Sequence, residues 1–334
     1  IVVWSAVREL CEKSWGNGIA LTPACAFAAT ANCLLASGCN PRFIDVALDT
    51  LNMDPECLIR DGVRIPGGGI PTVVQTIRDR RTIGIQFVAT MGKPMPIGMI
   101  AEIADRHGLY LIYDGCEAHG ATVLGGRHYA DRYADAAIYS FYTAHLIVGG
   151  EGGIICTDDD ELADMCRSVK SHGRPAGSIQ FDFQRSGFNS KWNEFCAAVA
   201  LEGLERFDET FAKRRAIRQA LIDALAQFED DLILYRDDPG EVISPHAFPV
   251  VLRDDGRDIK PLHDHLEKSG VQVKTLFGSL PTQHKAFEFL GHKLGDFPVA
   301  ERVGRTGLHF SCSEYIIDQD VDYIARTIGS FFKR

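Results

Sequence analysis

The sequence predicts an α/β protein with a mostly parallel central sheet and flanking helices, followed by a smaller C-terminal α+β domain. Two observations support this prediction. Short apolar runs alternate with segments of helical apolar spacing, which is the order of β-α-β units. The chain of 334 residues is also longer than the roughly 250 to 300 residues at which single hydrophobic cores stop growing. We therefore expect two domains.

Helices and strands alternate clearly in the first part of the chain. A helical pattern follows Pro23, and another ends at Gly108, a residue type that commonly terminates helices. The apolar run that closes on Asp114 is typical of a buried strand. The expected elements are a strand and a helix in residues 19–37, a strand and turn in 41–55, a strand in 82–90, a helix in 96–108 and a strand in 109–114. Such alternation favours a largely parallel sheet.

The second part of the chain completes the sheet and then leaves it. The next expected elements are strands in residues 135–142 and 152–159 and helices in 159–173, 193–207 and 211–228. We place the domain boundary after residue 211. Residues 1–211 then form a large α/β domain, and residues 212–334 form a small α+β domain. The small domain is expected to hold strands in 246–252 and 271–277 and two terminal helices.

Composition narrows the class of protein. The formal net charge is −10, and no run of lysines or arginines is present, which argues against a nucleic-acid or membrane-surface partner. No stretch approaches the roughly 18 apolar residues of a membrane span. The first residues have charges within their apolar pattern and no small-residue cleavage site, unlike a signal peptide. We therefore predict a cytoplasmic protein that acts on small molecules.

The ten cysteines are scattered, and no two have a C-x-x-C spacing. We interpret them as reduced thiols, because disulfide frameworks belong mainly to small secreted domains. Cys156, Cys166 and Cys196 are too far apart in sequence for a local cluster loop. The sequence therefore predicts no metal site and no iron–sulfur cluster.

Candidate functional residues lie just after the expected strands. Ligands of open α/β sheets bind outside the carboxyl ends of the strands, and Asp114 and Ser140 stand at two such ends. An isolated aspartate there is more often a turn former or a helix cap. The surrounding sequence is therefore needed to decide its role.

Two neighbouring motifs supply that context. YDGCEAHGA (residues 113–121) and SFYTAHLIVGGEGG (residues 140–153) resemble the patterns EDxAQxxGA and SFxxxKxxxxGEGG of the DegT/DnrJ/StrS nucleotide-sugar aminotransferases. The resemblance extends from about Leu21 to the last helix. It implies a fold type I transferase that depends on pyridoxal phosphate. It also implies an upstream segment with a glycine turn for the cofactor phosphate. We therefore expect either that the N-terminal part of the large domain is missing or that the phosphate site is damaged, and that cofactor binding is weakened.

The resemblance implies roles for five cofactor-binding residues. Asp114 would pair with the pyridine nitrogen, where a carboxylate keeps the ring an electron sink. Phe27 would lie flat against the ring, although an ordinary core role is the alternative. Glu117 would meet the ring hydroxyl, and Ser140 would bind the phosphate. Asn189 would reach the phosphate of a neighbouring subunit in a homodimer, although Asn is also a common turn residue.

His145 stands where the family has its cofactor-binding lysine. An isolated histidine is usually a surface or hydrogen-bonded core residue, but this one lies within the motif. An imidazole cannot bond covalently to the cofactor aldehyde, yet it can move protons near neutral pH. The substitution resembles the nucleotide-sugar 3-dehydratase branch, in which pyridoxamine phosphate and a catalytic histidine remove the 3-hydroxyl of a nucleotide-linked 4-keto-6-deoxyhexose. That reaction belongs to deoxysugar and lipopolysaccharide biosynthesis.

Residues 171–189 contain no cysteine, whereas the iron-dependent members of that branch carry a cysteine cluster in this region. We therefore expect the iron-free type, with glutamate as the amino donor. Two alternatives stay open. One is a non-catalytic homologue that binds sugars or serves as a dimer partner. The other is an aminotransferase that uses Lys93, Lys170 or Lys191. The sequence leaves the nucleotide and the hexose open.

Overall fold

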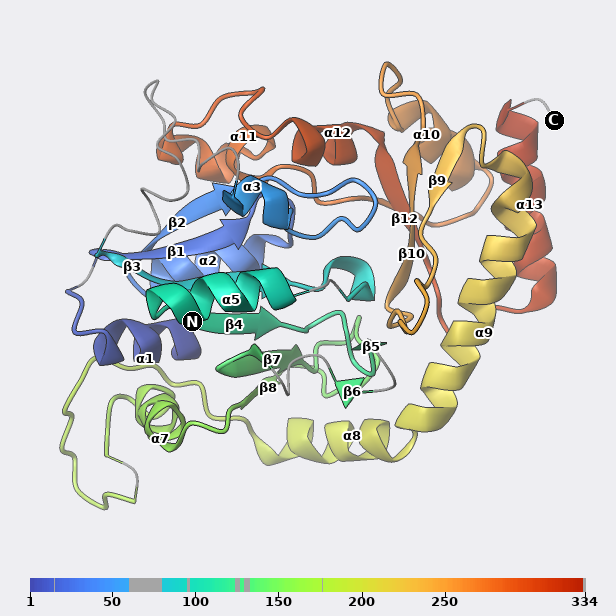
Figure 1. Cartoon of the computed structure of the whole chain (residues 1–334). Helices are drawn as coiled ribbons and strands as arrows, with labels where there is room; N and C mark the ends of the chain where they lie inside the picture. Colours follow the sequence, from blue (N-terminus) through green and yellow to red (C-terminus); the bar gives the residue numbers. More distant parts are fainter. Residues whose placement is uncertain are drawn as a thin grey trace.

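The computed structural model describes residues 1–14, 16–59, 80–94, 97–123, 127–128, 133–175 and 177–332 (Figure 1). Within these residues the chain forms a six-stranded sheet, a four-stranded sheet and a two-stranded hairpin. Helices pack on both larger sheets. The predicted α/β class with a mostly parallel central sheet is confirmed.

The six-stranded sheet has the order β2-β1-β3-β4-β7-β8. Its strands are β1 (Gly18–Pro23), β2 (Cys39–Ile44), β3 (Thr82–Val88), β4 (Tyr110–Asp114), β7 (Ala136–Ser140) and β8 (Gly153–Cys156). All neighbouring pairs are parallel except β7 with β8. The strand order reverses at β1, which lies between β2 and β3. Open α/β sheets bind ligands beside such a reversal.

Helices cover both faces of this sheet. The helices involved are α1 (Val2–Leu10), α2 (Ala28–Ala36), α5 (Gly98–His107) and α7 (Asp160–Val169). Ile100 and Ala104 of α5 pack against alternate strand residues such as Phe87. On the opposite face, α1, α2 and α7 share an apolar cluster with Ile112. Because side chains alternate along a strand, this arrangement buries the central strands β1, β3 and β4 on both sides.

The antiparallel pair β7–β8 follows from its connection. A parallel return requires a crossover of a dozen or more residues, usually through a helix. Residues 141–152 contain no helix and fold back as a glycine-rich turn. His145 lies in this turn, so the connection brings the motif histidine to the end of β7.

Two helices lead away from the sheet. They are α8 (Glu194–Glu205) and α9 (Phe207–Leu225), which runs toward the second sheet (Figure 1). The predicted domain boundary after residue 211 falls inside α9. The division into domains 1–211 and 212–334 stays a prediction.

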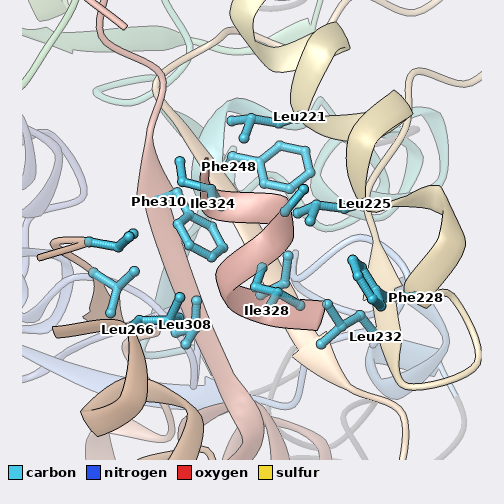
Figure 2. Packing of buried hydrophobic residues seen from close by; sticks show 14 of the residues in the cluster. Leu221, Leu225, Phe228, Leu232, Phe248, Leu266, Leu308, Phe310, Ile324 and Ile328 are labelled. Atoms are coloured by element: carbon cyan, nitrogen blue, oxygen red, sulfur yellow. The ribbon is translucent and has the colours of Figure 1, made fainter. Parts of the chain in front are cut away.

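The second sheet is antiparallel with the order β11-β12-β10-β9. Its strands are β9 (Leu232–Leu234), β10 (Ala247–Leu252), β11 (Lys274–Thr275) and β12 (Gly307–Ser311), and the neighbouring helices are α10 (Lys260–Lys268), α12 (Pro298–Thr306) and α13 (Asp318–Phe332). Leu225 of α9, Phe248 of β10 and Ile328 of α13 meet in its core (Figure 2). Smaller elements are α3 (Pro55–Ile59), α11 (Leu280–Gln283), β5 (Thr122–Val123) and β6 (Arg127–His128).

The two sheets are joined by apolar and polar contacts. One buried cluster includes Cys25 and Met91 from the first part and Val251 from the second. The Lys93 ammonium lies 2.9 Å from the Asp238 carboxylate and 2.9 Å from that of Glu241. These contacts fix the second sheet beside the carboxyl ends of the first.

None of the helices in the described ranges could span a membrane.

Candidate active site

Three of the predicted site residues lie, together with Met91, at one edge of the six-stranded sheet. Phe27 follows β1, Met91 follows β3, Asp114 closes β4 and Ser140 closes β7. Because these four strands are parallel, their carboxyl ends meet along the same edge. The topology therefore brings together residues that are far apart in sequence.

The Asp114 carboxylate is held in place by two donors. The Thr30 hydroxyl of α2 donates to Oδ2 at 3.3 Å, and the Cys116 backbone N–H donates to Oδ1 at 3.2 Å. Thr30 is buried, and Asp114 is half-buried. The side chain is therefore oriented, while a carboxylate still has room to accept further hydrogen bonds.

Phe27 is exposed, which excludes the alternative core role. Its ring has 61% of its surface accessible and makes an edge contact with Phe277, at a centroid distance of 5.8 Å. Phe27 also precedes the first turn of α2, where Thr30 binds Asp114. A large exposed aromatic ring suits a planar ligand. Its predicted stacking on the cofactor stays a prediction.

Ser140 and His145 belong to one turn. The Ser140 hydroxyl accepts a hydrogen bond from the Tyr142 backbone N–H at 3.2 Å. The His145 backbone N–H donates to the Tyr142 carbonyl oxygen at 3.0 Å. These bonds fix the backbone of His145 close to the end of β7.

Trp192 explains the glycines that follow His145. Its ring stacks on Phe141 with a centroid distance of 5.1 Å, and its Nε1–H donates to the Glu151 carbonyl oxygen. A Cβ atom on Gly152 would lie 2.3 Å from Trp192 Nε1, and the φ angle of +137° there also disfavours other residues. The glycine-rich motif thus lets the turn pass under an indole ring.

His145 is half-buried among other histidines. Its ring centroid lies 5.1 Å from that of His246 and 6.0 Å from that of His119. Nδ1 of His145 is buried without a hydrogen-bond partner among the described residues, so the hydrogen-bonded core role is excluded. Burial lowers the pKa of His145, Asp114 raises it and Arg214 lowers it further. The net shift favours a neutral imidazole near pH 7.

Glu117 is a largely buried carboxylate beside this cluster. Its Oε2 accepts a hydrogen bond from the Met91 backbone N–H at 2.7 Å, and its Oε1 lies 3.6 Å from His246 Nε2. Burial raises the pKa of Glu117 to about 7, with a smaller contribution from Asp114. Met91 has a φ angle of +54°, which is unusual for a residue with a side chain. Backbone strain of this kind often occurs at functional sites.

Two histidines of the cluster were not predicted from the sequence. His119 lies in the first motif, so its spacing to Asp114 was a usable signal. His246 precedes β10 of the second sheet, and nothing in its local sequence indicates that it faces His145. Burial lowers the pKa of His119 to about 4 and that of His246 well below its usual value. Both are therefore neutral at physiological pH.

Asn189 lies away from the strand ends. It is exposed, forms an isolated bridge with Ser171 and accepts a hydrogen bond from Lys191 at 2.9 Å. Its role across a subunit interface stays a prediction.

The three alternative lysines occupy different settings. Lys93 is buried against the carboxylates of Asp238 and Glu241. Lys170 and Lys191 are exposed. None of the three lysines lies in the turn after β7, where His145 stands.

Across the described parts of the chain, no three His, Cys, Asp or Glu side chains are grouped to hold a metal ion. The absence of a metal and of an iron–sulfur cluster stays a prediction.

A mostly parallel sheet with an oriented carboxylate at its carboxyl edge, and an antiparallel sheet beside that edge, defines a fold type I transferase. The model of the DegT/DnrJ/EryC1/StrS aminotransferase family matches residues 15–329, and the chain belongs to this family.

Named relatives include both dehydratases and enzymes with synthase names. A dTDP-4-dehydro-2,6-dideoxy-D-glucose 3-dehydratase of Saccharopolyspora spinosa is 27% identical over 93% of this chain and 69% of its own length. A GDP-perosamine synthase of Escherichia coli O157:H7 is 24% identical over 93% of this chain and 78% of its own. The family is thus shown, and the individual reaction is not.

Solved structures agree with the family. A DegT DnrJ EryC1 StrS aminotransferase from Brucella abortus is 25% identical, with a TM-score of 0.82, and the match covers 100% of this chain and 84% of that one. The aminotransferase from Psychrobacter cryohalolentis has a TM-score of 0.82 at 22% identity, covering 99% and 85% of the two chains. The second likeness concerns the fold alone.

The family uses pyridoxal 5'-phosphate or its amine form, pyridoxamine 5'-phosphate, as cofactor. The residues present fit this group. Asp114 is an oriented carboxylate with free acceptor capacity, and Phe27 is an exposed ring just before the helix whose Thr30 binds Asp114. Asp114 would hold the pyridine nitrogen, Phe27 the ring face and Ser140 the phosphate. Covalent attachment through His145 is chemically excluded, because imidazole has no primary amine.

Proposed function

We propose that the chain dehydrates a nucleotide-linked 4-keto-6-deoxyhexose at C-3, in deoxysugar or lipopolysaccharide biosynthesis. The observation that carries this proposal is His145. A half-buried imidazole with a lowered pKa stands in the motif at the position of the cofactor-binding lysine. A neutral imidazole is a good proton acceptor near pH 7, whereas it cannot anchor an aldehyde.

The protein's own residues have separate tasks in this reaction. When bound as its amine, the cofactor supplies the nitrogen that joins the 4-keto carbon and the electron pair that replaces the 3-hydroxyl. His145 accepts a proton at an imidazole nitrogen and can then donate it to the departing 3-hydroxyl, which leaves as water. Asp114 orients and polarises the ring from the pyridine side. Glutamate is the proposed amino donor that restores the amine form.

Two further observations support a dehydratase rather than an aminotransferase. Lys93, the only buried one of the three candidate lysines, already binds two carboxylates, and moving it would leave those charges unpaired. The Saccharopolyspora spinosa relative is named a 3-dehydratase. Other relatives have synthase or transaminase names, so amination is the alternative outcome of the test.

We also propose that the protein is a homodimer, with α8 in the interface. Of the residues in α8, Ala200 alone is buried, and several large apolar side chains on or next to the helix are exposed: Trp192, Phe195, Val199, Leu201 and Leu204. Exposed apolar patches of this kind mark interaction surfaces. Asn189 precedes the patch in sequence, which supports the proposal that it contacts the second subunit.

The test is product analysis by mass spectrometry. The purified protein is incubated with pyridoxamine phosphate, glutamate and the GDP-, dTDP- or CDP-linked 4-keto-6-deoxyhexose. A product that has lost one oxygen atom from the sugar supports 3-dehydration. An amino sugar indicates the aminotransferase alternative, and retention of no vitamin B6 compound indicates the non-catalytic homologue.

The matched control is His145→Lys. This variant restores the amine that can trap pyridoxal phosphate, so borohydride reduction should give a covalent adduct and 3-deoxygenation should be lost. A wild-type rate of 3-deoxygenation in His145→Lys would contradict the proposal.

A further inference from the structure

His246 is a buried histidine for which the proposed function has no role. It lies directly before β10, and its backbone N–H donates to the Ser244 carbonyl oxygen. Ser244 in turn donates from its backbone N–H to the carbonyl oxygen of Gly92, next to Met91. These bonds hold His246, which precedes a strand of the second sheet, at the carboxyl edge of the first sheet.

One side of the His246 ring faces a carboxylate. Nε2 of His246 lies 3.6 Å from Oε1 of Glu117, and the two side chains are 11% and 12% exposed. The other carboxylate oxygen of Glu117 is held by the Met91 backbone N–H at 2.7 Å. The carboxylate is therefore fixed in a position from which Oε1 can accept a hydrogen from His246. A carboxylate has about four acceptor sites, so a contact between Glu117 and the cofactor remains compatible.

The other side of the ring has an unsatisfied nitrogen. Nδ1 of His246 is buried without a partner among the described residues, and the same is true of Nδ1 of His145. The two ring centroids are 5.1 Å apart, with an angle of 32° between the planes. Catalytic hydrogen bonds are often long in ligand-free structures and tighten on substrate binding. The two unpartnered nitrogens therefore belong to adjacent rings.

We propose that Glu117, His246 and His145 form a relay in which Glu117 and His246 are positioning residues that hold the proton-accepting tautomer of His145. The proposal deepens the proposed function, because it assigns the support for its catalytic base. Glu117 accepts Nε2–H of His246, and the lone pair on Nδ1 of His246 accepts Nδ1–H of His145. Nε2 of His145 is then left with a lone pair that can take a proton from the reacting molecule.

The opposite tautomers of His246 and His145 would leave no proton acceptor at Nε2 of His145. If His246 donated from Nδ1 to Nδ1 of neutral His145, the hydrogen of His145 would lie on Nε2 and no lone pair would remain there. In the proposed arrangement, a proton that arrives at Nε2 makes His145 a cation. When ionised, Glu117 stabilises this charge through His246, whereas the aspartate of a serine-protease triad contacts the catalytic histidine directly. No bond between heavy atoms is made or broken in the relay.

Other charged and titratable groups also face His246. They are His119 from the loop after β4, Arg214 of α9 and His309 of β12. Arg214 is paired with Glu314 at 2.9 Å, and burial and the charge of Lys274 lower the pKa of His309 to about 4. Glu117 is thus the group among them that can supply a negative charge to His246.

The test is a double-mutant cycle that reads the titration of His145. The rate at which diethyl pyrocarbonate modifies His145, followed by mass spectrometry of its peptide, is measured against pH. We expect Glu117→Gln to lower the midpoint by a fraction of a pH unit, because the imidazolium loses an opposite charge that is only partly present where His145 titrates, since the pKa of Glu117 is about 7. In a His246→Phe background, the same change should leave the midpoint nearly where it was, because the connection is already broken.

Two variants separate the relay from simple packing. His246→Asn supplies an amide that can donate to Glu117 and accept from His145, so the effect of Glu117→Gln should return. His309→Asn changes a buried histidine on the neighbouring strand and should leave that effect intact. If His246→Phe does not fold, as judged by thermal unfolding, His246→Ala takes its place.

Equal midpoint shifts in the wild-type and His246→Phe backgrounds would overturn the relay, as would a His246→Asn variant that behaves like His246→Phe. This readout needs no substrate. A protein that makes no 3-deoxy product but shows the coupled titration would refute the proposed function and keep the relay. A protein that makes 3-deoxy product without the coupled titration would keep the proposed function and refute the relay.

Discussion

The core of the second sheet and the histidine site are both buried, but they are buried with different chemistry. In the core, Leu225, Phe248 and Ile328 have no exposed surface and contact apolar neighbours (Figure 2). In the site, His145 and His246 each bury a ring nitrogen that has no partner in the described chain. Moving an apolar group out of water lowers the free energy, whereas burying a polar group without a hydrogen-bond partner raises it.

The comparison shows what each region is built for. Core side chains stabilise the fold, and their contributions depend on volume and packing. The site retains buried polar groups and a positive φ angle at Met91 that do not stabilise the fold. We therefore expect core substitutions to lower stability and site substitutions to lower activity with stability retained.

The largest expected effect is on turnover. His145→Asn keeps a polar side chain of smaller size but removes the proton acceptor, so kcat should fall on the order of 10²- to 10⁴-fold. Cofactor binding and the thermal unfolding temperature should stay close to wild type. The measurement is the initial rate of 3-deoxy product formation, together with spectroscopic titration of pyridoxamine phosphate. A wild-type rate would remove His145 from the mechanism.

The core variant should show the opposite pattern. Leu225→Ala removes a fully buried side chain and leaves a cavity, which should lower the free energy of unfolding by about 3 kcal/mol. Below the unfolding transition, kcat should remain within a few-fold of wild type. Urea unfolding and the initial rate report the two quantities. A large loss of kcat in folded Leu225→Ala protein would show that the two regions are coupled.

The smallest effect is a pH-dependent change in stability at Glu117. Its pKa in the folded chain, about 7, is above its ordinary value of 4.5. The folded state therefore binds the proton more tightly, so the contribution of Glu117 is fully present below pH 4.5 and is lost as the pH rises through 7. The loss is on the order of 1 to 3 kcal/mol.

Thermal unfolding of wild type and Glu117→Gln between pH 5 and 8, without cofactor, measures this effect. The unfolding temperature of the wild type should fall relative to that of the variant as the pH rises, because the amide does not ionise. Parallel curves would mean that Glu117 is not desolvated as the fold indicates, and that its burial does not reduce the stability of the fold at neutral pH.

The sequence by itself determined the main architecture and the two motifs that contain Asp114 and His145. Strand and helix patterns placed the helix that ends at Gly108, which adopts a φ angle of +61°, and the strand that closes on Asp114. These features could be predicted because they depend on local periodicity and on the backbone preference of glycine. The motif around His145 likewise indicated the family, because its residues are contiguous.

Only the tertiary structure decided the surroundings of His145. Glu117 follows β4 and His246 precedes β10, and no local pattern shows that two sheets place them 3.6 Å apart. Their pKa values also depend on burial, which the assembled chain alone defines. Sequence determines contacts between neighbours in the chain. Desolvation and proximity between distant segments arise only when the strand ends of one sheet meet the first strand residues of the other.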